Sequence, residues 1–380
     1  MKKARVIAFY LPQYHPIKEN NEWWGAGFTE WTNVAKAKPL FKGHVQPHIP
    51  ADLGFYDLRL PEVREQQAQM AREAGIEGFC YWEYWFEKGK QLLERPFEEV
   101  LASGKPDFPF CLGWANDSWT NKTWKASNSK VKSEWLMEQK YSIDDYIAHF
   151  NHLLPAFKDS RYITVDGKPI YVVFKPLNIP NPKEFIDLWN KLAIENGLKG
   201  IHFVGLSYNF SFRNGTSHKI ELHNTNNAAA IYENILNQGF DAINSRGTFR
   251  AETILDGMAK KAMILCLERF LHIDIIKKYS QKKINNLLYT PEDKWDNVYP
   301  TIIPNWDRSP RSGKKAVIYT GSTPEAFRQQ LNLVLSLLEK KPFEHRIVFA
   351  QSWNEWGEGN YLEPDLQYGH QFLDILKEML

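Results

Sequence analysis

The sequence predicts an α/β protein, a (β/α)₈ TIM barrel, from three observations. Short apolar runs rich in strand-forming residues alternate with amphipathic helical stretches from end to end, which is typical of parallel βα units rather than of a sandwich. There are eight such runs, the number of strands in this barrel. Polar and aromatic residues follow the end of nearly every run, where barrel enzymes collect their active-site residues.

The eight expected strands cover residues 5–10, 78–82, 108–114, 170–174, 201–206, 240–243, 301–304 and 346–351. Helical periodicity is clear over residues 60–74, 143–157, 182–196 and 323–340, and each stretch begins near Asp, Ser, Thr or Pro, as helices do. A chain of 380 residues could hold two domains, but α/β barrels of this size are often undivided. We therefore expect a single catalytic domain over residues 1–380.

Long segments at the strand ends exceed what a minimal barrel needs. Residues 20–51 are too aromatic for disorder, so we expect a lid over the site. Residues 213–227 are polar and predict a surface loop. Residues 251–290 form an expected helical insertion rich in lysine. Its simplest interpretation is a solvated amphipathic helix pair, and contact with a membrane surface or a lipid-linked substrate is the alternative.

Charge and composition narrow the partners. Lys and Arg number 47 against 45 Asp and Glu, a net charge of +2, which is too balanced for a nucleic-acid surface. Fourteen tryptophans exceed the needs of one core and predict exposed stacking platforms. We expect Cys80, Cys111 and Cys266 to be reduced core thiols, because their spacing is not that of metal ligands.

The sequence predicts no metal, no cofactor and a cytoplasmic protein. A zinc site of His15, His44, His48 and Asp52 is conceivable from residue types, but the spacing does not support it. The N-terminal residues enter a strand-like run directly, without a signal-peptide pattern, and no run is apolar enough to span a membrane.

The strongest catalytic pattern is the pair Glu355 and Glu358 in residues 352–359, Ser-Trp-Asn-Glu-Trp-Gly-Glu-Gly, directly after the last apolar run. Residues three apart on a helical turn have Cβ atoms roughly 5–6 Å apart, close to the carboxyl separation of retaining glycosidases, about 5–5.5 Å. Neighbouring indoles can bind sugar rings and raise the pKa of one carboxyl, and the glycines permit a sharp turn. The alternative is a turn with solvated glutamates.

Residues at the other strand ends are expected to bind the substrate. Asn116 and Asp117 suit vicinal hydroxyls, Glu83 is a candidate third carboxylate, and Arg308 fits either a structural ion pair or an acidic sugar. The full predicted set is Tyr14, His15, Trp31, Trp82, Glu83, Trp114, Asn116, Asp117, Trp306, Arg308, Trp353, Asn354 and Trp356.

Several motifs resemble the WbsX-type proteins, relatives of glycoside hydrolase family 99 from bacterial surface-polysaccharide gene clusters. The motifs are residues 8–16 (Ala-Phe-Tyr-Leu-Pro-Gln-Tyr-His-Pro), 24–31, 78–82 and 353–359. The resemblance implies a barrel that acts on carbohydrate as a retaining endo-α-mannosidase does. It also implies that Glu355 deprotonates the sugar 2-hydroxyl to give an anhydro-sugar, and that Glu358 serves as acid and then as base. Trp-Gly stands between the glutamates here, where family 99 tends to carry Trp-His.

These observations predict a retaining glycoside hydrolase of surface-polysaccharide metabolism, with an oligosaccharide or polysaccharide substrate. A glycosyltransferase of O-antigen or capsule biosynthesis, using a nucleotide-sugar or lipid-linked donor, is the alternative. Against it, the sequence has no Gly-rich phosphate cradle and no Asp-x-Asp motif. A non-catalytic glycan-binding barrel is the third hypothesis.

Overall fold

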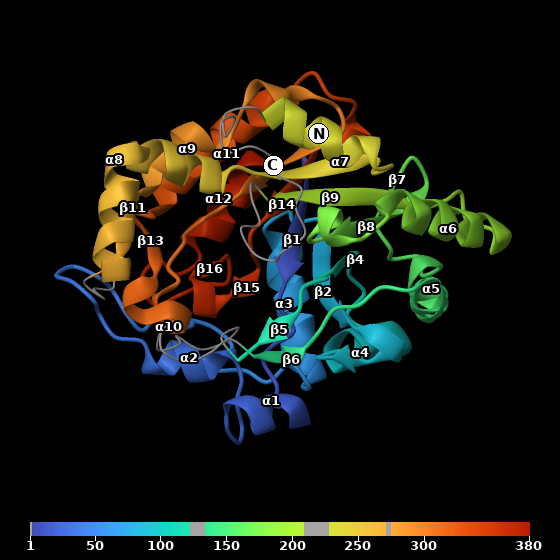
Figure 1. The fold of residues 1–380 in the computed structure, drawn as a ribbon, viewed down its shortest axis with the longest axis horizontal. Coiled ribbons are helices and arrows are strands. Elements are labelled where there is room, and N and C mark those ends of the chain that lie inside the picture. The colour runs from blue at the N-terminus through green and yellow to red at the C-terminus, as the bar shows by residue number, and fades with distance from the viewer. Residues whose placement is uncertain (1, 122–133, 209–227, 271–274) are drawn as a thin grey trace.

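The computed structural model describes residues 2–121, 134–208, 228–270 and 275–380, and its centre is a closed barrel of eight parallel strands (Figure 1). Each strand pairs with the next along the chain, and β1 pairs with both β2 and β14, which closes the ring. The predicted (β/α)₈ barrel is confirmed. Its strands are β1 (Arg5–Tyr10), β2 (Gly78–Trp85), β4 (Phe110–Trp114), β8 (Lys168–Val173), β9 (His202–Tyr208), β10 (Ala242–Arg246), β12 (Val298–Ile302) and β14 (Ile347–Ala350).

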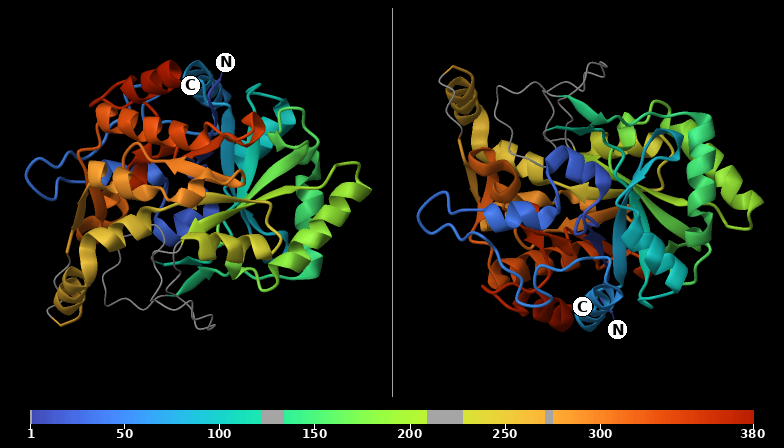
Figure 2. Two further views of the ribbon diagram at one scale, coloured as in Figure 1. Left: turned by 90° about the horizontal axis from the view of Figure 1, so that it is seen from above. Right: turned by 90° about the horizontal axis from the view of Figure 1, so that it is seen from below.

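Helices surround the barrel (Figure 2), and the four that the periodicity predicts lie within two residues of the expected bounds. Side-chain caps explain two of their starts: Ser142 Oγ accepts from the Asp145 N–H and Thr323 Oγ1 from the Ala326 N–H, both at 3.2 Å. The helices are α1 (Lys18–Trp24), α2 (Glu30–Lys36), α3 (Pro61–Glu73), α4 (Arg95–Ser103), α5 (Ile143–Phe157), α6 (Pro182–Glu195), α7 (Ala228–Asn237), α8 (Thr248–Phe270), α9 (Gln281–Leu288), α10 (Ser309–Ser312), α11 (Pro324–Leu338) and α12 (Gln371–Met379).

The seventh barrel strand, β12, begins earlier than expected. The apolar pattern places its start at residue 301, whereas the structure starts it at Val298 and continues it through Pro300. Proline donates no backbone hydrogen bond and rarely occupies a central strand, so the pattern excludes the first residues. Short strands decorate the barrel: β3 (Gln91–Leu92), β5 (Trp119–Thr120), β6 (Trp135–Met137), β7 (Thr164–Val165), β15 (Asn354–Glu355) and β16 (Asn360–Tyr361).

Aromatic side chains fill much of the core. Inside the barrel, Phe9 of β1 stacks on Trp82 at a centroid distance of 4.7 Å and on Phe349 at 5.0 Å. Cys80 and Cys111 are free thiols buried in the strands, as expected, but Cys266 is exposed on α8. The predicted core position of Cys266 is therefore wrong.

The insertion at residues 251–290 is not a simple helix pair. After α8, which kinks at Gly257 (φ 61°), the strand β11 (Lys277–Ser280) pairs with β13 (Val317–Thr320) in a separate two-stranded sheet. Ala251, Tyr279, Ile284, Leu288, Ile303, Trp306 and Tyr319 form a small hydrophobic core there. The four residues of β11, two of them lysines, are too few and too polar to predict a strand. The insertion therefore packs onto the segment after β12.

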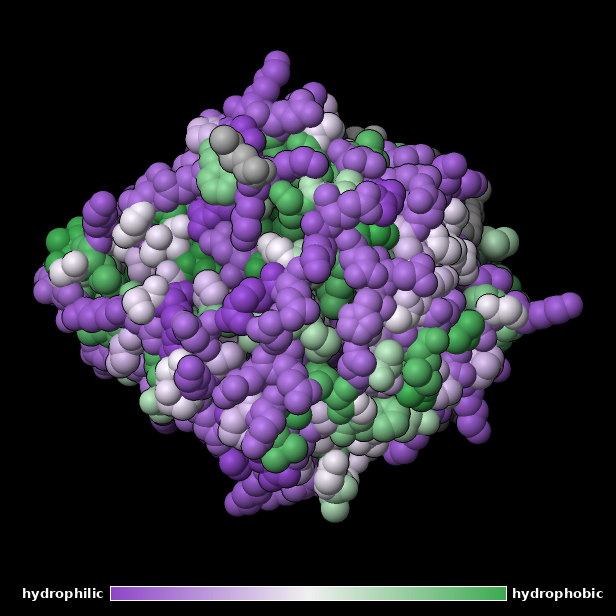
Figure 3. Space-filling model, turned by 180° about the vertical axis from the view of Figure 1, so that it is seen from behind, coloured by the Kyte–Doolittle hydropathy of each residue, from purple (hydrophilic) through white to green (hydrophobic). Residues whose placement is uncertain are grey.

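The long segment after β1 forms part of the mouth of the barrel. Its helix α2 contacts α10 and the 3₁₀ turn Trp356–Glu358, and Figure 1 shows α2 and α10 side by side near β15 and β16. The predicted surface loop at 213–227 lies outside the described residues. Across the described part of the chain, every helix is too short or too polar to cross a lipid bilayer. The face in Figure 3 is largely hydrophilic, with apolar residues in scattered groups.

Candidate active site

The two predicted catalytic carboxylates meet at the barrel mouth around one guanidinium. Glu355 ends β15 and Glu358 ends the following 3₁₀ turn. Arg311 Nη1 donates to Glu355 Oε1 at 3.1 Å and to Glu358 Oε1 at 2.8 Å. Arg308 Nη2 lies 2.9 Å from the same Glu358 oxygen. The glutamate side chains are only 14% and 13% exposed, so both are largely buried.

A buried third carboxylate, Glu30, holds this guanidinium in place. Arg311 Nε and Nη2 donate to the two Glu30 oxygens at 2.9 Å each. Glu30 is fully buried at the start of α2, and Arg311 lies in α10. Glu30 and Arg311 are not among the site residues that the sequence predicts. Glu30 lies inside the motif of residues 24–31, and Arg311 is three residues after Arg308, but nothing in the sequence connects the two.

The surroundings drive the pKa values of the pair apart. Burial, reinforced by the negative charge of Glu358, raises the pKa of Glu355 to about 7. Burial also acts to raise the pKa of Glu358, but the positive charges of Arg308 and Arg311 outweigh it and lower that pKa to about 2. The pair therefore holds one proton below neutral pH, and the proton lies on Glu355. The resemblance implies that Glu358 is the acid, and in that role Glu358, not Glu355, must hold the proton when the reaction starts.

Three predicted ligands of the substrate instead build the frame of the catalytic turn. The Tyr14 hydroxyl donates to the Asn354 carbonyl and accepts from the Trp356 N–H at 3.1 Å. The Asn354 side chain pairs with the Leu11 backbone, accepting at 2.8 Å and donating at 3.1 Å. Trp356 Nε1 donates to Glu363 at 2.6 Å. Tyr14, Asn354 and Trp356 are at most 1% exposed, so they position the turn and present no face to a ligand.

The other predicted stacking platforms are also buried. Trp353, Trp114, Trp306 and Trp31 are 0%, 1%, 5% and 8% exposed. Trp114 Nε1 donates to the Trp85 carbonyl at 3.1 Å, and Trp31 Nε1 donates to the Tyr56 carbonyl at 2.8 Å. A buried indole N–H that has a backbone partner costs little, as for Trp114 and Trp31, and all four rings belong to hydrophobic cores. The expectation of exposed platforms is wrong for these residues.

Trp306 and Trp82 still bear on the site. The guanidinium of Arg246, at the end of β10, lies 4.9 Å from the centroid of the Trp306 ring. Its positive charge acts on both Glu355 and Glu358, lowering the pKa of each. Trp82 is half-buried inside the barrel, flat against Phe9. Trp306 therefore positions a charge, and Trp82 keeps some exposed surface.

Glu83 faces away from the carboxylate pair. Its Oε1 lies 3.0 Å from His149 Nε2 of α5 and accepts from the Tyr171 hydroxyl. Successive residues of a strand point to opposite faces, so the neighbouring Tyr84 points inward. Burial raises the pKa of Tyr84, and the charge of Glu355 raises it further. The structure therefore does not bring Glu83 together with Glu355 and Glu358, and Tyr84 is the neighbouring β2 residue whose side chain lies near them.

Asn116 and Asp117 differ in their positions. Asn116 Oδ1 accepts from the Lys175 N–H at 2.7 Å and its Nδ2 donates to the Lys175 carbonyl at 2.9 Å. Asn116 is 1% exposed and joins the segments after β4 and β8. Asp117 is 46% exposed, with Lys175 Nζ 2.7 Å away, and this pair is open to a ligand.

His15 lies apart from the carboxylate pair, in a separate pocket. It is 2% exposed, and burial lowers the pKa of its ring to about 4. The other histidines considered for a metal site have different partners: His44 Nε2 lies 2.6 Å from Asp307 Oδ2, and His48 Nδ1 lies 2.9 Å from the Tyr361 hydroxyl. Over the ranges that the structure describes, no group of three His, Cys, Asp or Glu side chains is placed to bind a metal.

Comparison with known structures supports the fold. The GH99 endo-α-mannosidase from Bacteroides thetaiotaomicron, in complex with BIS-TRIS-propane, superposes with a TM-score of 0.54 at 14% identity over 99% of this chain and 96% of that one. A glycoside hydrolase-like protein gives a TM-score of 0.55 at 14% identity over 100% and 94%. At this identity the likeness concerns the fold alone.

Sequence comparison gives the family. The uncharacterized protein WxcX of Xanthomonas campestris pv. campestris (strain B100) is 35% identical over 388 residues, which is 99% of this chain and 50% of that protein. The chain thus spans about half the length of the curated relatives that it matches. A family model described as "Glycosyltransferase WbsX" matches residues 6–376. The chain therefore belongs to the WbsX family of carbohydrate-active proteins, described as glycosyltransferases.

Proposed function

We propose that the chain is a retaining glycoside hydrolase, similar to an endo-α-mannosidase, with Glu355 and Glu358 as its catalytic pair. The observation that carries this proposal is the shared contact with Arg311 Nη1, at 3.1 and 2.8 Å. The two facing oxygens must lie within about 6 Å of each other, near the spacing of retaining enzymes and below the roughly 6.5–9.5 Å of inverting ones. The divided pKa values leave one proton on the pair, and the proposed roles require that proton to move from Glu355 to Glu358 before the reaction begins.

The proposed reaction has two steps. Glu355 takes the proton of the sugar 2-hydroxyl, and that oxygen attacks the anomeric carbon while the glycosidic bond breaks. Glu358 gives its proton to the leaving oxygen and then takes one from the water that opens the anhydro-sugar. Glu355 returns its proton to the 2-oxygen. These roles require the shared proton to be on Glu358 at the start, and the common contact with Arg311 keeps the carboxyls close enough to exchange it.

Glycosyl fluorides test the roles directly, because a fluoride leaves without a proton. We expect Glu358→Gln to lose hydrolysis of α-linked oligosaccharides but to keep the first step with the matching fluoride, seen as a burst of fluoride release, since only the later opening of the anhydro-sugar needs Glu358 as a base. Glu355→Gln should lose both activities. The exposed Glu378→Gln, on α12, is the control and should keep both. The opposite pattern would exchange the two roles, and full activity in both active-site variants would refute the catalytic pair.

A glycosyltransferase is the second candidate, and the family description favours it. The same barrel would then transfer the sugar to another glycan instead of to water. The two are separated by incubating the chain with α-linked oligosaccharides, with and without nucleotide-sugar or lipid-linked donors. Release without a donor supports the hydrolase. Turnover that appears only with a donor, and that Glu358→Gln abolishes, supports the transferase. Binding of the glycan without turnover in either assay would support the third hypothesis, a non-catalytic glycan-binding barrel.

The biological setting is part of the same proposal. The resemblance to proteins of polysaccharide gene clusters supports a role in bacterial surface-polysaccharide metabolism, with O-antigen or capsule as the glycan. A lipid-linked intermediate in the cytoplasm would be a suitable substrate. The chain spans about half the length of its curated relatives. In proteins of that length, segments outside this barrel would contribute to the activity. Mass spectrometry of lipid-linked saccharides from cells with and without Glu358→Gln checks this setting.

A further inference from the structure

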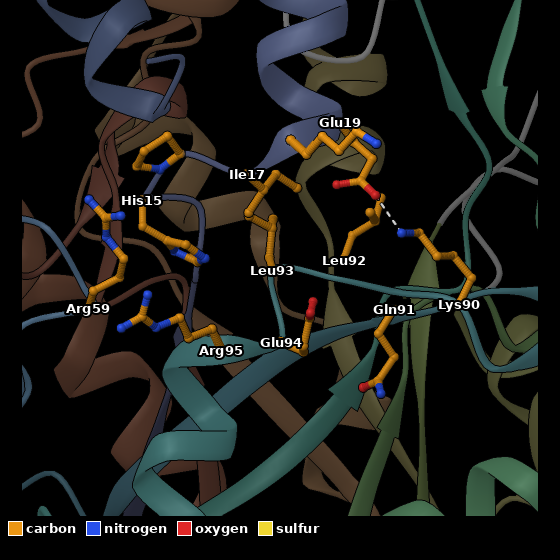
Figure 4. Close-up of a pocket in the computed structure, with 12 residues that line it drawn as sticks. His15, Ile17, Glu19, Arg59, Lys90, Gln91, Leu92, Leu93, Glu94 and Arg95 are labelled. Carbon is orange, nitrogen blue, oxygen red and sulfur yellow. Dashed lines mark hydrogen bonds and ion pairs between the residues drawn. The ribbon is translucent and has the colours of Figure 1, made fainter. Parts of the chain in front are cut away.

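A polar pocket of about 280 Å³ lies beside the segment that follows β1. Residues from three parts of the chain line it: the start of α1, Arg59, and the segment from β3 to the start of α4. Figure 4 shows His15, Arg59 and Arg95 on one side of this pocket, and Glu19 with its partner Lys90 on the other. The carboxylate pair is not among the lining residues, so the pocket is a separate site.

His15 brings a buried acceptor to the pocket. Its Nδ1 lies 3.1 Å from the Pro12 carbonyl, which can only accept, so Nδ1 carries the hydrogen. Nε2 then presents a lone pair, and it has no hydrogen-bond partner in the described structure although His15 is 2% exposed. An unpartnered buried polar atom is costly unless a ligand binds to it. A hydroxyl group would donate to this nitrogen.

Two arginines bring donors to the same side. Arg59 binds Asp57 through Nε and Nη2, at 3.0 and 2.6 Å, and Arg95 binds Glu99 through Nε at 2.6 Å. No described residue accepts from Arg59 Nη1 or from the two Nη atoms of Arg95. Burial is the main cause of the lowered pKa of His15. The positive charges of Arg59 and Arg95 lower this pKa further, whereas the negative charge of Asp57 raises it. All three side chains line this one pocket, on the same side of it in Figure 4, so one ligand in the pocket can meet them together.

We propose that this pocket binds an acidic sugar, whose carboxylate or phosphoryl group contacts Arg59 and Arg95 and whose neighbouring hydroxyl donates to His15 Nε2. The arginines supply the forked donors that suit planar carboxylates and phosphates. Arg59 and Arg95 keep their carboxylate partners, so the ligand would contact the remaining Nη donors, and a simple anion without a hydroxyl group would offer no donor to His15 Nε2. This proposal rests on the proposed glycan substrate and adds that the glycan carries an acidic unit away from the bond that is processed.

The order of the chain connects this pocket to the catalytic turn. His15 follows Tyr14, whose hydroxyl bonds to Asn354 and Trp356 on either side of Glu355. Two consecutive residues thus contact both sites: Tyr14 is hydrogen-bonded to the catalytic turn, and His15 lines the pocket. An acidic unit bound here would be held at a fixed position relative to Glu355.

Isothermal titration of the full chain with glucuronic acid, glucose 6-phosphate, glucose and inorganic phosphate tests the pocket. We expect at least one acidic sugar to bind at least about ten-fold more tightly than glucose, which corresponds to one charge-assisted hydrogen bond. The double variant Arg59→Gln/Arg95→Gln should lose this preference. Arg328→Gln, which removes an arginine of the remote α11–α12 ion pair, should keep it. The more tightly bound acid identifies the group as carboxylate or phosphoryl.

Equal affinity for glucose and both acids would overturn the proposal, as would an unchanged preference in the double variant. Inorganic phosphate binding as tightly as glucose 6-phosphate would also overturn it, because the sugar hydroxyl would then contribute nothing. His15→Gln should weaken the binding of the acidic sugar and leave the binding of inorganic phosphate unchanged. If this variant does not fold, the double arginine variant tests the proposal instead. Titration of Glu358→Gln gives the same answer without turnover, so failure of the hydrolase proposal is distinguishable.

Discussion

Glu30 and Arg311 form a two-bond ion pair, with both distances 2.9 Å, across a sequence separation of 281 residues. The pair links the segment after the first barrel strand to the segment after the seventh. The third nitrogen of the same guanidinium then contacts both catalytic carboxylates. The geometry of the site therefore depends on a residue that need not touch the substrate.

Glu30→Gln should lower both stability and activity. An amide offers one acceptor oxygen and an N–H₂ group that opposes the guanidinium, so Arg311 loses a partner inside the protein. Breaking a buried ion pair costs about 3–5 kcal/mol, and we expect about 3 kcal/mol here. Urea unfolding measures the loss, and kcat for oligosaccharide release should fall with it. The exposed Glu378→Gln should leave the urea midpoint unchanged, and an unchanged midpoint in Glu30→Gln would contradict the prediction.

Gly357→Ala should displace Glu30. A Cβ on Gly357 would lie 1.6 Å from Glu30 Oε1, so one of the two must move. The expected result is a loss of stability and activity in the same direction as Glu30→Gln. The two sites share one space, so Glu30→Ala/Gly357→Ala should cost less than the sum of the single variants. A thermal-denaturation cycle of the four proteins measures the coupling, and additive costs would show that Glu30 and Gly357 do not compete.

The pH profile of activity should report the shared proton. Above about pH 7 Glu355 loses its proton and both carboxyls are ionised, so no acid remains and kcat/KM should fall. On the acid side, Arg308 lowers the pKa of Glu358 after burial raises it. Arg308→Gln should therefore move the acidic limb to higher pH and leave the basic limb less affected. Profiles of wild type and Arg308→Gln that coincide would exclude this electrostatic role.

Glu363 should make stability depend on pH. Burial raises its pKa to about 7, although Trp356, Gln67 and Tyr56 donate to it. An unfolded glutamate has a pKa of about 4.3, so the native state holds the extra proton between these values. The stabilisation is complete below about pH 4 and is lost progressively as pH rises to about 7, by up to about 4 kcal/mol. Glu363→Gln should remove this slope in urea unfolding at pH 4–8, and a slope equal to that of wild type would assign it to another group.

The sequence predicts the barrel well because its eight strands and the four helices with clear periodicity are marked by local patterns. The apolar runs need only their own composition, and the caps Ser142 and Thr323 directly precede the helices that they start. The two-stranded sheet of β11 and β13 has no such signal, since four polar residues gain their strand geometry from a distant partner.

The candidate site divides in the same way. The Glu355 and Glu358 pair is visible as a spacing, whereas Arg311 and Glu30 become neighbours only when the barrel closes. Aromatic residues at strand ends suggest sugar platforms, but burial decides their role, and sequence does not show that Trp353 and Trp356 lie under the turn rather than on it. Alternation along β2 could have separated Glu83 from Tyr84, had the inward face been known.

The contact between Glu30 and the backbone of Gly357 also bears on how these sequences can diverge. The side chain of Glu30 occupies the space that a side chain at position 357 would need. A large residue at position 30 therefore requires a small residue at position 357, or a displacement of α2. Among homologues, a glutamate at the first position should occur with glycine at the second, and histidine at the second should occur with a different residue at the first. The residues of the catalytic turn and of the α2 segment would then covary among homologues.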